Sequence, residues 1–368
     1  MNFTQLKSII PALLMSDDDN ERPVSIELIS PPGRGKSDFA RDLISLMTAK
    51  TGEEWGHAEL FLGTQTPSDL VGYFFKGYIK GPNNEDVAIT EATLPKWMLT
   101  TKGKPAWMYK HGVLILEEFG QGEVDVKRAA AELLLHGGCG GHQLPPGWVV
   151  IATSNRASDR SGVTKSLDFV INRRCEIHIT DDLASWERWA FEKNVDSLFI
   201  SFAAANPQIV FSDGVPEKQG PWCTPRSLVR LHDMMRRLKD DTGKLRTDDL
   251  VVELAAGMIG QAAAAQLFTH IRLGHEMPQL EDIIKDPKGV KVPQKPDACI
   301  LVTYNLAQRV DGSNAVPVLT YMKRLPKEFG VTFAKTACTR NPKLVFSDAF
   351  VDWANSNSSL MTALAELK

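Results

Sequence analysis

The sequence predicts an α/β domain, in which helices flank a five-stranded parallel sheet, followed by an all-α region. From residue 23 to about residue 180, short apolar runs alternate with helical patterns. Two of these runs, 113–116 and 148–152, are continuously apolar, which is typical of strands covered by helices on both faces. After residue 181 the strand patterns fade and amphipathic helical patterns follow. We therefore expect the sheet in the first half of the chain and the helical region in the second.

The composition is that of a globular protein. The 368 residues are 43% hydrophobic and 24% charged, which excludes a disordered or collagen-like chain. The formal net charge of -3 argues against a protein that mainly coats nucleic acid. The five cysteines are scattered and form no Cys-x-x-Cys pair, so we expect a reducing, cytoplasmic setting. No apolar run approaches the ~18 residues of a membrane span, so we expect no membrane partner.

The individual elements follow from patterns along the chain. Leu6, Ile9, Ile10, Leu13 and Leu14 lie at helical spacing, so a short amphipathic helix is expected to pack on the domain. The expected strands are residues 25–30, 58–62, 113–117, 148–154 and 175–179. The expected helices of the second half are residues 186–202, 226–239, 247–273, 297–310 and 315–325. The proline-rich stretch 278–296 is expected to be a loop.

A phosphate-binding loop follows the first expected strand. That strand runs into Pro-Pro-Gly-Arg-Gly-Lys-Ser, residues 31–37, and a helical pattern begins at Lys36. Glycines allow the backbone N–H groups to turn toward a phosphate, and we expect Lys36 to reach the β and γ oxygens and Ser37 to bind magnesium. The usual first glycine of this motif is Ser30 here. We expect the nucleotide to contact Pro32, Gly33, Arg34, Gly35, Lys36, Ser37 and Asp38.

Polar residues end two of the apolar strands. Strand 113–117 ends in Glu117 and Glu118, and strand 148–154 is followed by Asn155. Buried acids are costly unless they meet a cation, a reacting water or bulk solvent. We expect Glu117 to hold magnesium and Glu118 to polarise the water that attacks the γ-phosphate. Asn155 is a candidate for orienting that water, and the alternative is an ordinary turn residue.

Three arginines are candidates for neutralising charge in the reaction. Arg173 and Arg174 precede the last expected strand, and either a solvated loop residue or a finger reaching a neighbouring subunit's nucleotide fits this position. Arg226 lies in the first turn of an expected helix, after Thr224 as N-cap and Pro225 at the first helical position. A cation there opposes the helix dipole, so Arg226 is either a functional residue or a solvated surface arginine.

In this order and spacing, the motifs resemble those of the AAA+ ATPases and, within them, the MoxR-type branch. Segments 67–72 and 94–97 are similar to the branch's Asp-Leu-x-Gly and Pro-x-Trp segments. The first acid of the pair is usually Asp, where this chain has Glu117. The resemblance implies Lys36 and Ser37 as Walker A, Glu117 and Glu118 as Walker B, Asn155 as sensor 1, Arg173 or Arg174 as the arginine finger in trans, and Arg226 as sensor 2.

The resemblance also implies an organisation and an activity. It divides the chain into an N-terminal helix (1–22), an α/β nucleotide-binding core (23–182), a helical lid (183–285) and a C-terminal helical extension (286–368). It implies magnesium-dependent ATP hydrolysis between subunits of a homo-oligomeric ring, most often a hexamer, which remodels or activates a client protein. Such clients often carry a von Willebrand A domain.

Two other functions remain alternatives. One is a AAA+ motor or loader acting on DNA, against which the near-neutral charge argues. The other is a nucleotide-gated scaffold that does not hydrolyse ATP, suggested by Ser30 and Glu117. Measuring whether DNA or a protein raises the rate of hydrolysis separates the first alternative from protein remodelling.

Two further segments have more than one interpretation. Residues 73–78, Tyr-Phe-Phe-Lys-Gly-Tyr, are either an aromatic loop that grips a polypeptide or aromatic side chains packed under their own loop. Residues 136–142, His-Gly-Gly-Cys-Gly-Gly-His, suggest a metal site, but a structural zinc site needs four ligands and no fourth candidate lies nearby. A flexible glycine-rich turn between a helix and a strand is the simpler interpretation of the second segment.

Overall fold

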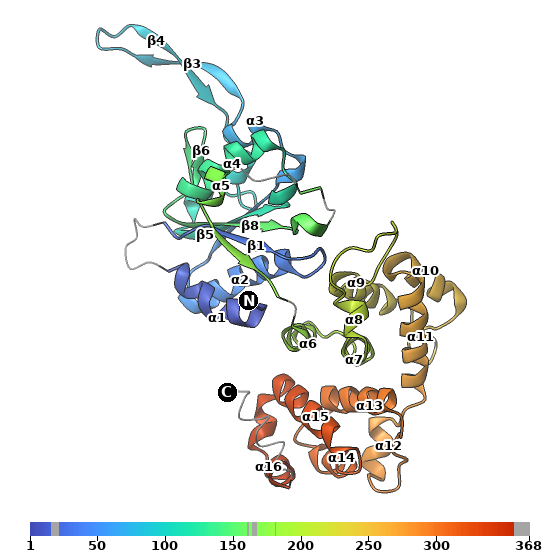
Figure 1. The fold of residues 1–368 in the computed structure, drawn as a ribbon. Helices are drawn as coiled ribbons and strands as arrows, with labels where there is room; N and C mark the ends of the chain where they lie inside the picture. Colours follow the sequence, from blue (N-terminus) through green and yellow to red (C-terminus); the bar gives the residue numbers. More distant parts are fainter. Residues whose placement is uncertain (16–21, 160–161, 164–167, 181, 357–368) are drawn as a thin grey trace. The chain divides into compact units, whose positions relative to one another are not determined.

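The chain forms two compact units. The computed structural model describes residues 1–15, 22–159, 162–163, 168–180 and 182–356. One unit comprises Met1–Asp181 and Asp213–Val215, and the other comprises Asp182–Ser212 and Pro216–Lys368. The first unit contains a parallel sheet, and the described residues of the second form helices joined by loops (Figure 1). We call them the sheet unit and the helical unit.

The sheet has five parallel strands, as the sequence predicts. They are β1 (Ile26–Ile29), β2 (Gly56–Phe61), β5 (His111–Glu117), β8 (Gly147–Ser154) and β9 (Cys175–His178). Their order in space is β2-β5-β8-β1-β9, and every neighbouring pair is parallel. This order places the carboxyl end of β8 between those of β5 and β1. The loop after β1 and the residues after β5 and β8 therefore share one edge of the sheet.

Helices cover both faces of the sheet, which explains the continuously apolar strands. Val113, Ile115, Val149 and Ile151 pack in one cluster with α1 (Phe3–Leu13) and α2 (Lys36–Thr51). Alternate residues of the same strands pack on the other face with α4 (Val124–His136). Successive side chains of a strand point to opposite faces, so both sets must be apolar. The amphipathic N-terminal helix predicted from sequence is confirmed as α1, since Leu6 and Ile10 are fully buried.

A tryptophan locks the amino ends of three adjacent strands together. Gly56 pairs with Gly112, which pairs with Trp148 on the next strand. A Cβ added at either glycine would lie 2.4 Å from an atom of the Trp148 ring. The indole Nε1 also donates a hydrogen bond to Tyr109 O over 3.2 Å. The two glycines therefore leave the space that the fully buried tryptophan fills.

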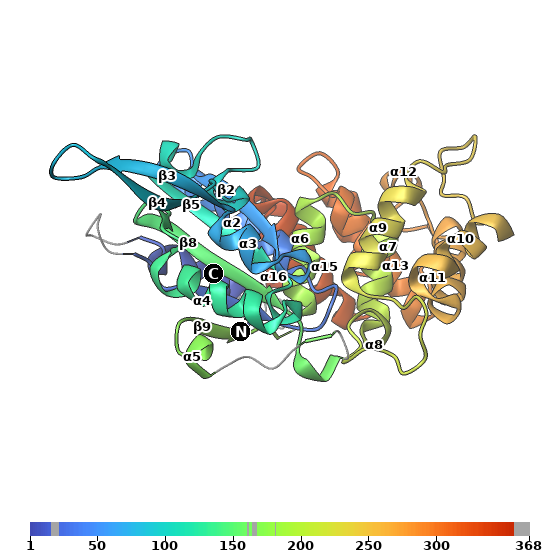
Figure 2. The ribbon, with the colours of Figure 1, turned by 90° about the horizontal axis from the view of Figure 1, so that it is seen from above.

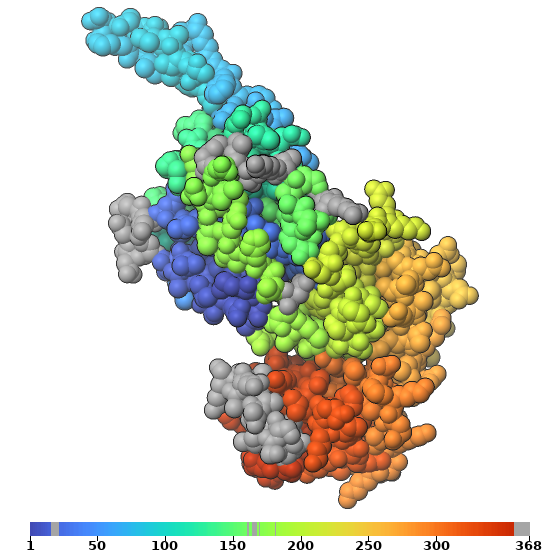
Figure 3. Space-filling model, viewed as in Figure 1, coloured from blue at the N-terminus to red at the C-terminus, as the bar shows by residue number. Residues whose placement is uncertain are grey.

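A long insertion separates β2 from β5. It contains η1 (Leu62–Thr64), α3 (Pro67–Val71), a hairpin of β3 (Phe74–Lys80) and β4 (Asp86–Ala92), and two short turns, η2 (Lys96–Met98) and η3 (Ala106–Met108). The hairpin extends away from the rest of the sheet unit in all views (Figures 1, 2 and 3). Trp97 is fully buried and donates a hydrogen bond from Nε1 to Leu70 O over 2.8 Å. This bond joins the segment before the hairpin to the segment after it.

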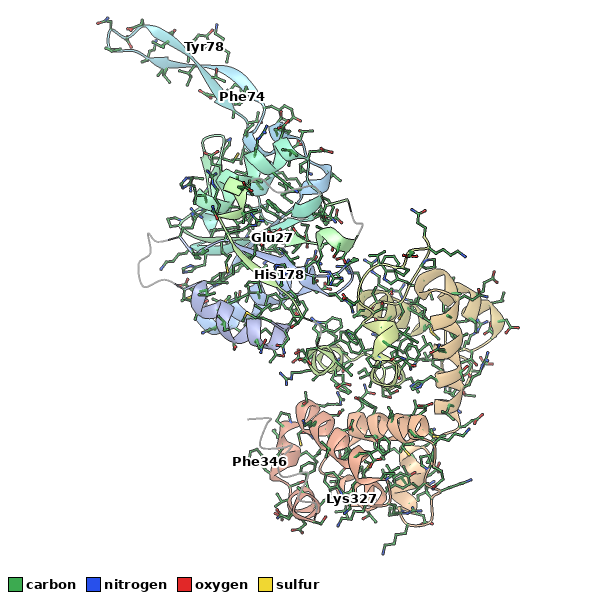
Figure 4. The ribbon with its side chains drawn as sticks, viewed as in Figure 1. Glu27, Phe74, Tyr78, His178, Lys327 and Phe346 are labelled. Carbon is green, nitrogen blue, oxygen red and sulfur yellow. The ribbon has the colours of Figure 1, made fainter. Side chains whose placement is uncertain are left out.

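The hairpin corrects both interpretations of residues 73–78 as a loop. Antiparallel pairing with β4 makes residues 74–78 part of a strand, and Phe74 and Tyr78 are 67% and 58% exposed rather than packed under the chain (Figure 4). Aromatic and β-branched residues favour the strand, and Asn84 closes the turn with a positive φ of 68°. The glycine-rich turn of residues 136–142 is confirmed, as a small hairpin of β6 (Gly138–Cys139) and β7 (His142–Gln143).

The described part of the helical unit contains eleven α-helices. They are α6 (Leu183–Glu192), α7 (Ser197–Ala205), α8 (Pro207–Val210), α9 (Pro225–Met235), α10 (Asp249–Ile259), α11 (Gln261–His275), α12 (Leu280–Lys285), α13 (Pro296–Arg309), α14 (Ala315–Met322), α15 (Lys327–Arg340) and α16 (Asp348–Asn355). Two helices expected to be continuous are each interrupted, by Asn194 with φ 56° and by Gly260 with φ 84°. The proline-rich stretch expected to be a loop contains α12.

The helical unit has two apolar clusters. One joins residues of α6 to α11 with Tyr304 of α13, and the other joins residues of α12 to α16. Leu280 and Ile283 of α12 belong to the second cluster, so α12 packs with the C-terminal helices. Among the described residues, no helix has both the length and the apolar character that crossing a membrane requires.

Candidate active site

The loop between β1 and α2 forms the centre of the candidate site. Gly33 and Gly35 have positive φ values of 77° and 88°, a conformation that favours glycine over residues with a Cβ. Gly35 is the N-cap of α2, and among the described residues no side chain caps this helix start. The N-terminus of α2 therefore faces the loop, which is the usual arrangement at a phosphate-binding helix terminus.

Lys36 joins this loop to the neighbouring strand. Its Nζ donates hydrogen bonds to Ser30 O over 2.9 Å and to Ser30 Oγ over 3.1 Å. It also donates to Pro31 O and to Asn155 Oδ1, both over 3.1 Å. The lysine is only 7% exposed, and these four acceptors are neutral. An anion placed in the loop would therefore form a stronger, charge-assisted bond with the ammonium group.

These hydrogen bonds place Asn155 and Ser30 at the phosphate loop. Asn155, which follows β8, lies against the loop rather than in a remote turn, since its amide oxygen accepts a bond from Lys36. Ser30, which replaces the usual glycine, is 1% exposed, and its hydroxyl accepts a bond from Lys36 and donates one to Pro31 O. The replacement is therefore accommodated within the loop.

Glu117 lies beside the first turn of α2. Its Oε2 accepts hydrogen bonds from Ser37 Oγ over 2.8 Å and from Thr153 Oγ1 over 2.5 Å. Its Oε1 is buried and has no hydrogen-bond partner among the described residues, and Arg41 Nη2 lies 3.6 Å away. A buried carboxylate oxygen with an unused lone pair, beside a serine hydroxyl, is the donor set that Mg²⁺ prefers. Glu117 and Ser37 therefore fit a magnesium ion.

Glu118 differs from Glu117 in both exposure and backbone conformation. Its side chain is exposed, and its φ of 55° and ψ of 37° lie in the left-handed region, where non-glycine residues are uncommon. The backbone N–H of Glu118 donates a hydrogen bond to Thr153 Oγ1 over 3.4 Å. The Glu118 carboxylate lies beside Gly63, since a Cβ added at Gly63 would lie 3.3 Å from Glu118 Oε2. Such conformations cluster at functional sites. The strained turn separates the two carboxylates, one buried and one accessible.

The structure separates the two candidate arginines before β9. The side chain of Arg174 is 2% exposed, and its Nε donates a hydrogen bond to Glu27, which is labelled in Figure 4. Arg174 also donates to Val170 O over 2.6 Å and to Glu176 Oε1 over 2.8 Å. A guanidinium held by three partners of its own subunit is not available to a neighbour. This argues against Arg174 as a finger. Arg173 is half-buried, and its role as a finger stays a prediction.

Three other predicted residues have less direct relations to the loop. Arg34 is 8% exposed. Asp38 is exposed in the first turn of α2 and forms an ion pair with Arg41 over 3.4 Å. Arg226 is exposed in the first turn of α9, in the helical unit, where Thr224 and Pro225 take the predicted N-cap and first helical positions. The roles assigned to these three residues stay predictions.

Sequence reasoning missed Thr153, Arg41 and Glu59. Arg41 on α2 forms ion pairs with Glu59 over 2.6 Å and with Glu117 over 3.6 Å. The hydrogen bond to Glu59 raises the pKa of Arg41 above its usual value. Two signals in the sequence point to these residues. Thr153 is a hydroxyl two residues before Asn155, and Glu59 is an acid inside an otherwise apolar strand. Neither signal indicates the partner that the side chain binds.

Together, these residues can bind a phosphate group and a divalent cation and present an accessible carboxylate to water. No family model matches this sequence, and no curated protein matches it. Among solved structures, a mutant of RuvB from Thermotoga maritima is similar, with a TM-score of 0.37 and 13% identity over 78% of this chain and 77% of that chain. A TM-score of 0.37 is too low to establish a shared fold, so the function proposed for the chain rests on the residues of the site.

Proposed function

We propose that this chain is an AAA+ ATPase of the MoxR-type branch, which uses Mg²⁺ to hydrolyse ATP between the subunits of a homo-oligomeric ring and thereby remodels a client protein. A hexamer is the ring size we propose. The observation that carries the proposal is the meeting of Lys36, Ser37 and Glu117 around one glycine-rich loop, at the carboxyl edge of a parallel sheet. Ligands of open α/β sheets bind at this edge.

Nucleotide binding follows from the loop. The N–H groups of residues 33–37 and the N-terminus of α2 would hold the β-phosphate, and Lys36 would exchange its neutral acceptors for phosphate oxygens. Ser37 and Glu117 would hold Mg²⁺. When bound, this ion neutralises charge on the β and γ oxygens. Adenine as the base and the contribution of Arg34 and Asp38 follow from the resemblance of the motifs.

Hydrolysis requires a residue that orients water, and Glu118 is the candidate. Its carboxylate is exposed, whereas the carboxylate of Glu117 is buried and bonded to Ser37 and Thr153. A carboxylate that is free of such bonds can accept a proton from water or polarise it. Asn155 contacts Lys36, so it lies close enough to the loop to orient the same water. We propose Arg173 as the finger that a neighbouring subunit supplies and Arg226 as the sensor in the helical unit.

The projecting hairpin is the surface we propose for the client. Its aromatic residues are exposed on both faces of a two-stranded ribbon, and Phe74 and Tyr78 lie on the same face because they are four residues apart in one strand (Figure 4). Such a surface suits an extended polypeptide better than DNA, because the hairpin carries acidic as well as basic side chains, for example in the Lys80–Asp86 ion pair. A von Willebrand A domain is the client class that the resemblance suggests.

The test of nucleotide binding is a titration of a fluorescent ATP analogue into the full chain with Mg²⁺. Wild type should bind, and Lys36→Ala should lose at least about tenfold in affinity because it removes a charge-assisted bond to phosphate. Lys50→Ala, at the exposed far end of the same helix, is the control and should bind as wild type does. Equal binding by all three proteins would contradict the proposal. Sedimentation with ATP measures the ring size.

The client class is tested by stimulation of hydrolysis. Addition of DNA should leave the rate of phosphate release unchanged, whereas an unfolded or von Willebrand A protein should raise it. A rise with DNA alone would favour the motor or loader function instead. The Glu118→Gln form held with ATP should retain its client in a pull-down, which identifies the client directly.

A further inference from the structure

We propose that Arg41 lowers the affinity of the magnesium site by competing with the cation for Glu117. Glu59 limits this competition, because its hydrogen bond keeps the guanidinium away from the Glu117 carboxylate. The inference rests on the proposed function, since it concerns the same cation. Its evidence is the position of Arg41 between two carboxylates that come from different strands. Nothing in the motifs of the phosphate loop requires an arginine at this place.

The contact with Glu117 is a competition for one oxygen. Arg41 Nη2 lies 3.6 Å from Glu117 Oε1, which is the buried oxygen without a hydrogen-bond partner among the described residues. The other oxygen of this carboxylate is occupied by Ser37 and Thr153. A divalent cation that binds Glu117 therefore has to approach Oε1 beside a guanidinium. Two cations within a few ångströms repel each other, and solvent screens this repulsion only in part, because the Glu117 side chain is 4% exposed and that of Arg41 is 40% exposed.

The contact with Glu59 is closer and restrains Arg41. Arg41 Nε donates a hydrogen bond to Glu59 Oε1 over 2.6 Å, about the length expected of a charge-assisted bond. The distance to Glu117 is too long for a hydrogen bond. Arg41 thus bonds to Glu59 and contributes only its charge to Glu117. The same Glu59 oxygen lies 2.9 Å from His57 Nε2, so Glu59 is itself held in place.

The sheet register explains why two strands place their carboxylates around one arginine. Phe61 of β2 pairs with Glu117 of β5, and Glu59 lies two residues earlier on β2. Residues two apart share a face of the strand, so Glu59 and Glu117 both point to the face covered by α2. Arg41 lies on α2 above them and also pairs with Asp38 on its own helix over 3.4 Å. Three carboxylates therefore surround one guanidinium.

The proposal predicts opposite effects for two substitutions. Arg41→Gln removes the competing charge, so the site should bind a divalent cation about tenfold more tightly. Glu59→Gln removes a negative charge and the strongest restraint on Arg41, so the guanidinium can bond to Glu117 Oε1 and cation binding should weaken about tenfold. Arg41→Lys keeps a positive charge near Glu117, so the cation should bind less tightly than it does to Arg41→Gln.

The experiment is a titration of the full chain with Mn²⁺ in the presence of saturating ADP, in which electron paramagnetic resonance measures free Mn²⁺. ADP affinity in EDTA is measured for each variant, and it should not change because Arg41 has no role in the phosphate loop. Glu54→Gln and Lys50→Gln are matched controls. Each makes the same change of charge at an exposed position, Glu54 in an ion pair with Lys102 and Lys50 at the end of α2.

Opposite shifts in Mn²⁺ affinity for Arg41→Gln and Glu59→Gln support the inference. It is overturned if both variants bind Mn²⁺ as wild type does, or if Arg41→Gln weakens binding, because Arg41 would then support the site rather than compete for it. These outcomes leave the proposed function intact, since wild type still binds ADP. Wild type that binds neither ADP nor Mn²⁺ contradicts the proposed function and overturns the inference with it.

Discussion

Ser37 Oγ on α2 donates a hydrogen bond to Glu117 Oε2 on β5 over 2.8 Å. The two residues are 80 positions apart in the chain. The strand order brings them together, because the carboxyl end of β5 and the loop after β1 lie at the same edge of the sheet. This bond links the last residue of the phosphate-loop motif to Glu117, the first acid of the pair that ends β5. It joins the two motifs on which the proposed ATPase activity depends.

Substituting the two arginines before β9 should have different consequences. Arg174→Gln breaks a buried ion pair with Glu27 and should lower the free energy of unfolding by about 3–5 kcal/mol, because it leaves a buried carboxylate without its counter-charge. Arg173→Gln should lower it less, because Arg173 is half-buried whereas the Arg174 side chain is only 2% exposed, and it should abolish hydrolysis while nucleotide affinity is unchanged. Urea unfolding and phosphate release measure the two effects. Equal loss of stability in both variants would contradict this division of roles.

Adding a methyl group at Gly112 should destabilise the sheet unit. A Cβ there would lie 2.4 Å from the buried Trp148 ring, so Gly112→Ala should cost about 1–3 kcal/mol in unfolding free energy. Gly257→Ala is the matched control, because nothing lies within 4 Å of its added Cβ in α10. That substitution should stabilise the protein by about 0.5–1 kcal/mol. A thermal or urea melt in which Gly112→Ala is neutral would show that Trp148 is not confined as described.

The strands and the loop could be predicted from sequence because their signals are local. Continuous apolar runs identify covered strands, and the glycines beside Lys36 identify the loop within a few residues of chain. The ion pairs of Arg174 with Glu27 and of Arg41 with Glu59 could not be predicted, because each joins residues whose proximity depends on strand order and register. The sequence alone does not distinguish a solvated arginine from a buried one.

The hairpin and the helix breaks were missed for other physical reasons. Both faces of β3 and β4 are largely exposed, so the alternation of buried and exposed residues that normally identifies a strand is absent there. Asn194 and Gly260 interrupt apolar patterns that would otherwise continue through one long helix. The backbone at each takes a positive φ, which ends a helix whatever the surrounding periodicity.

The buried histidine of α11 should make stability depend on pH. Burial lowers the pKa of His270 from 6.5 to about 4, and its Nε2 lies 2.8 Å from Ser201 Oγ. The unfolded chain therefore binds a proton that the folded chain excludes between pH 6.5 and 4. Stability should fall as the pH falls through this window, by up to about 3 kcal/mol from this residue. Above pH 6.5 the residue should contribute no pH dependence.

Comparing two histidine variants across pH isolates this effect. His270→Gln keeps an acceptor for Ser201 but cannot be protonated, so its unfolding free energy should depend less on pH between 6.5 and 4. His136→Gln, at the exposed end of α4, should retain the pH dependence of wild type. If wild type and His270→Gln lose stability in parallel over this range, His270 is not the residue responsible.

Removing the aromatic side chains of the hairpin should impair client binding alone. Phe74→Ser with Tyr78→Ser should leave unfolding free energy within about 0.5 kcal/mol of wild type, because both side chains are exposed. Basal hydrolysis should persist, whereas the ATP-held Glu118→Gln form carrying these changes should lose its client in a pull-down. Phe346→Ser, at an 85% exposed phenylalanine of the helical unit, is the control (Figure 4). Equal client recovery with and without the hairpin aromatics would exclude the hairpin as the client surface.

The most direct test of the ATPase assignment is phosphate release by the full chain with ATP and Mg²⁺, compared among wild type, Lys36→Ala and Glu118→Gln. Wild type should turn over. Lys36→Ala should fail because it does not hold the nucleotide, and Glu118→Gln should bind ATP but release phosphate at least about a hundredfold more slowly. Release of phosphate by all three proteins at the same background rate would contradict the assignment of the site.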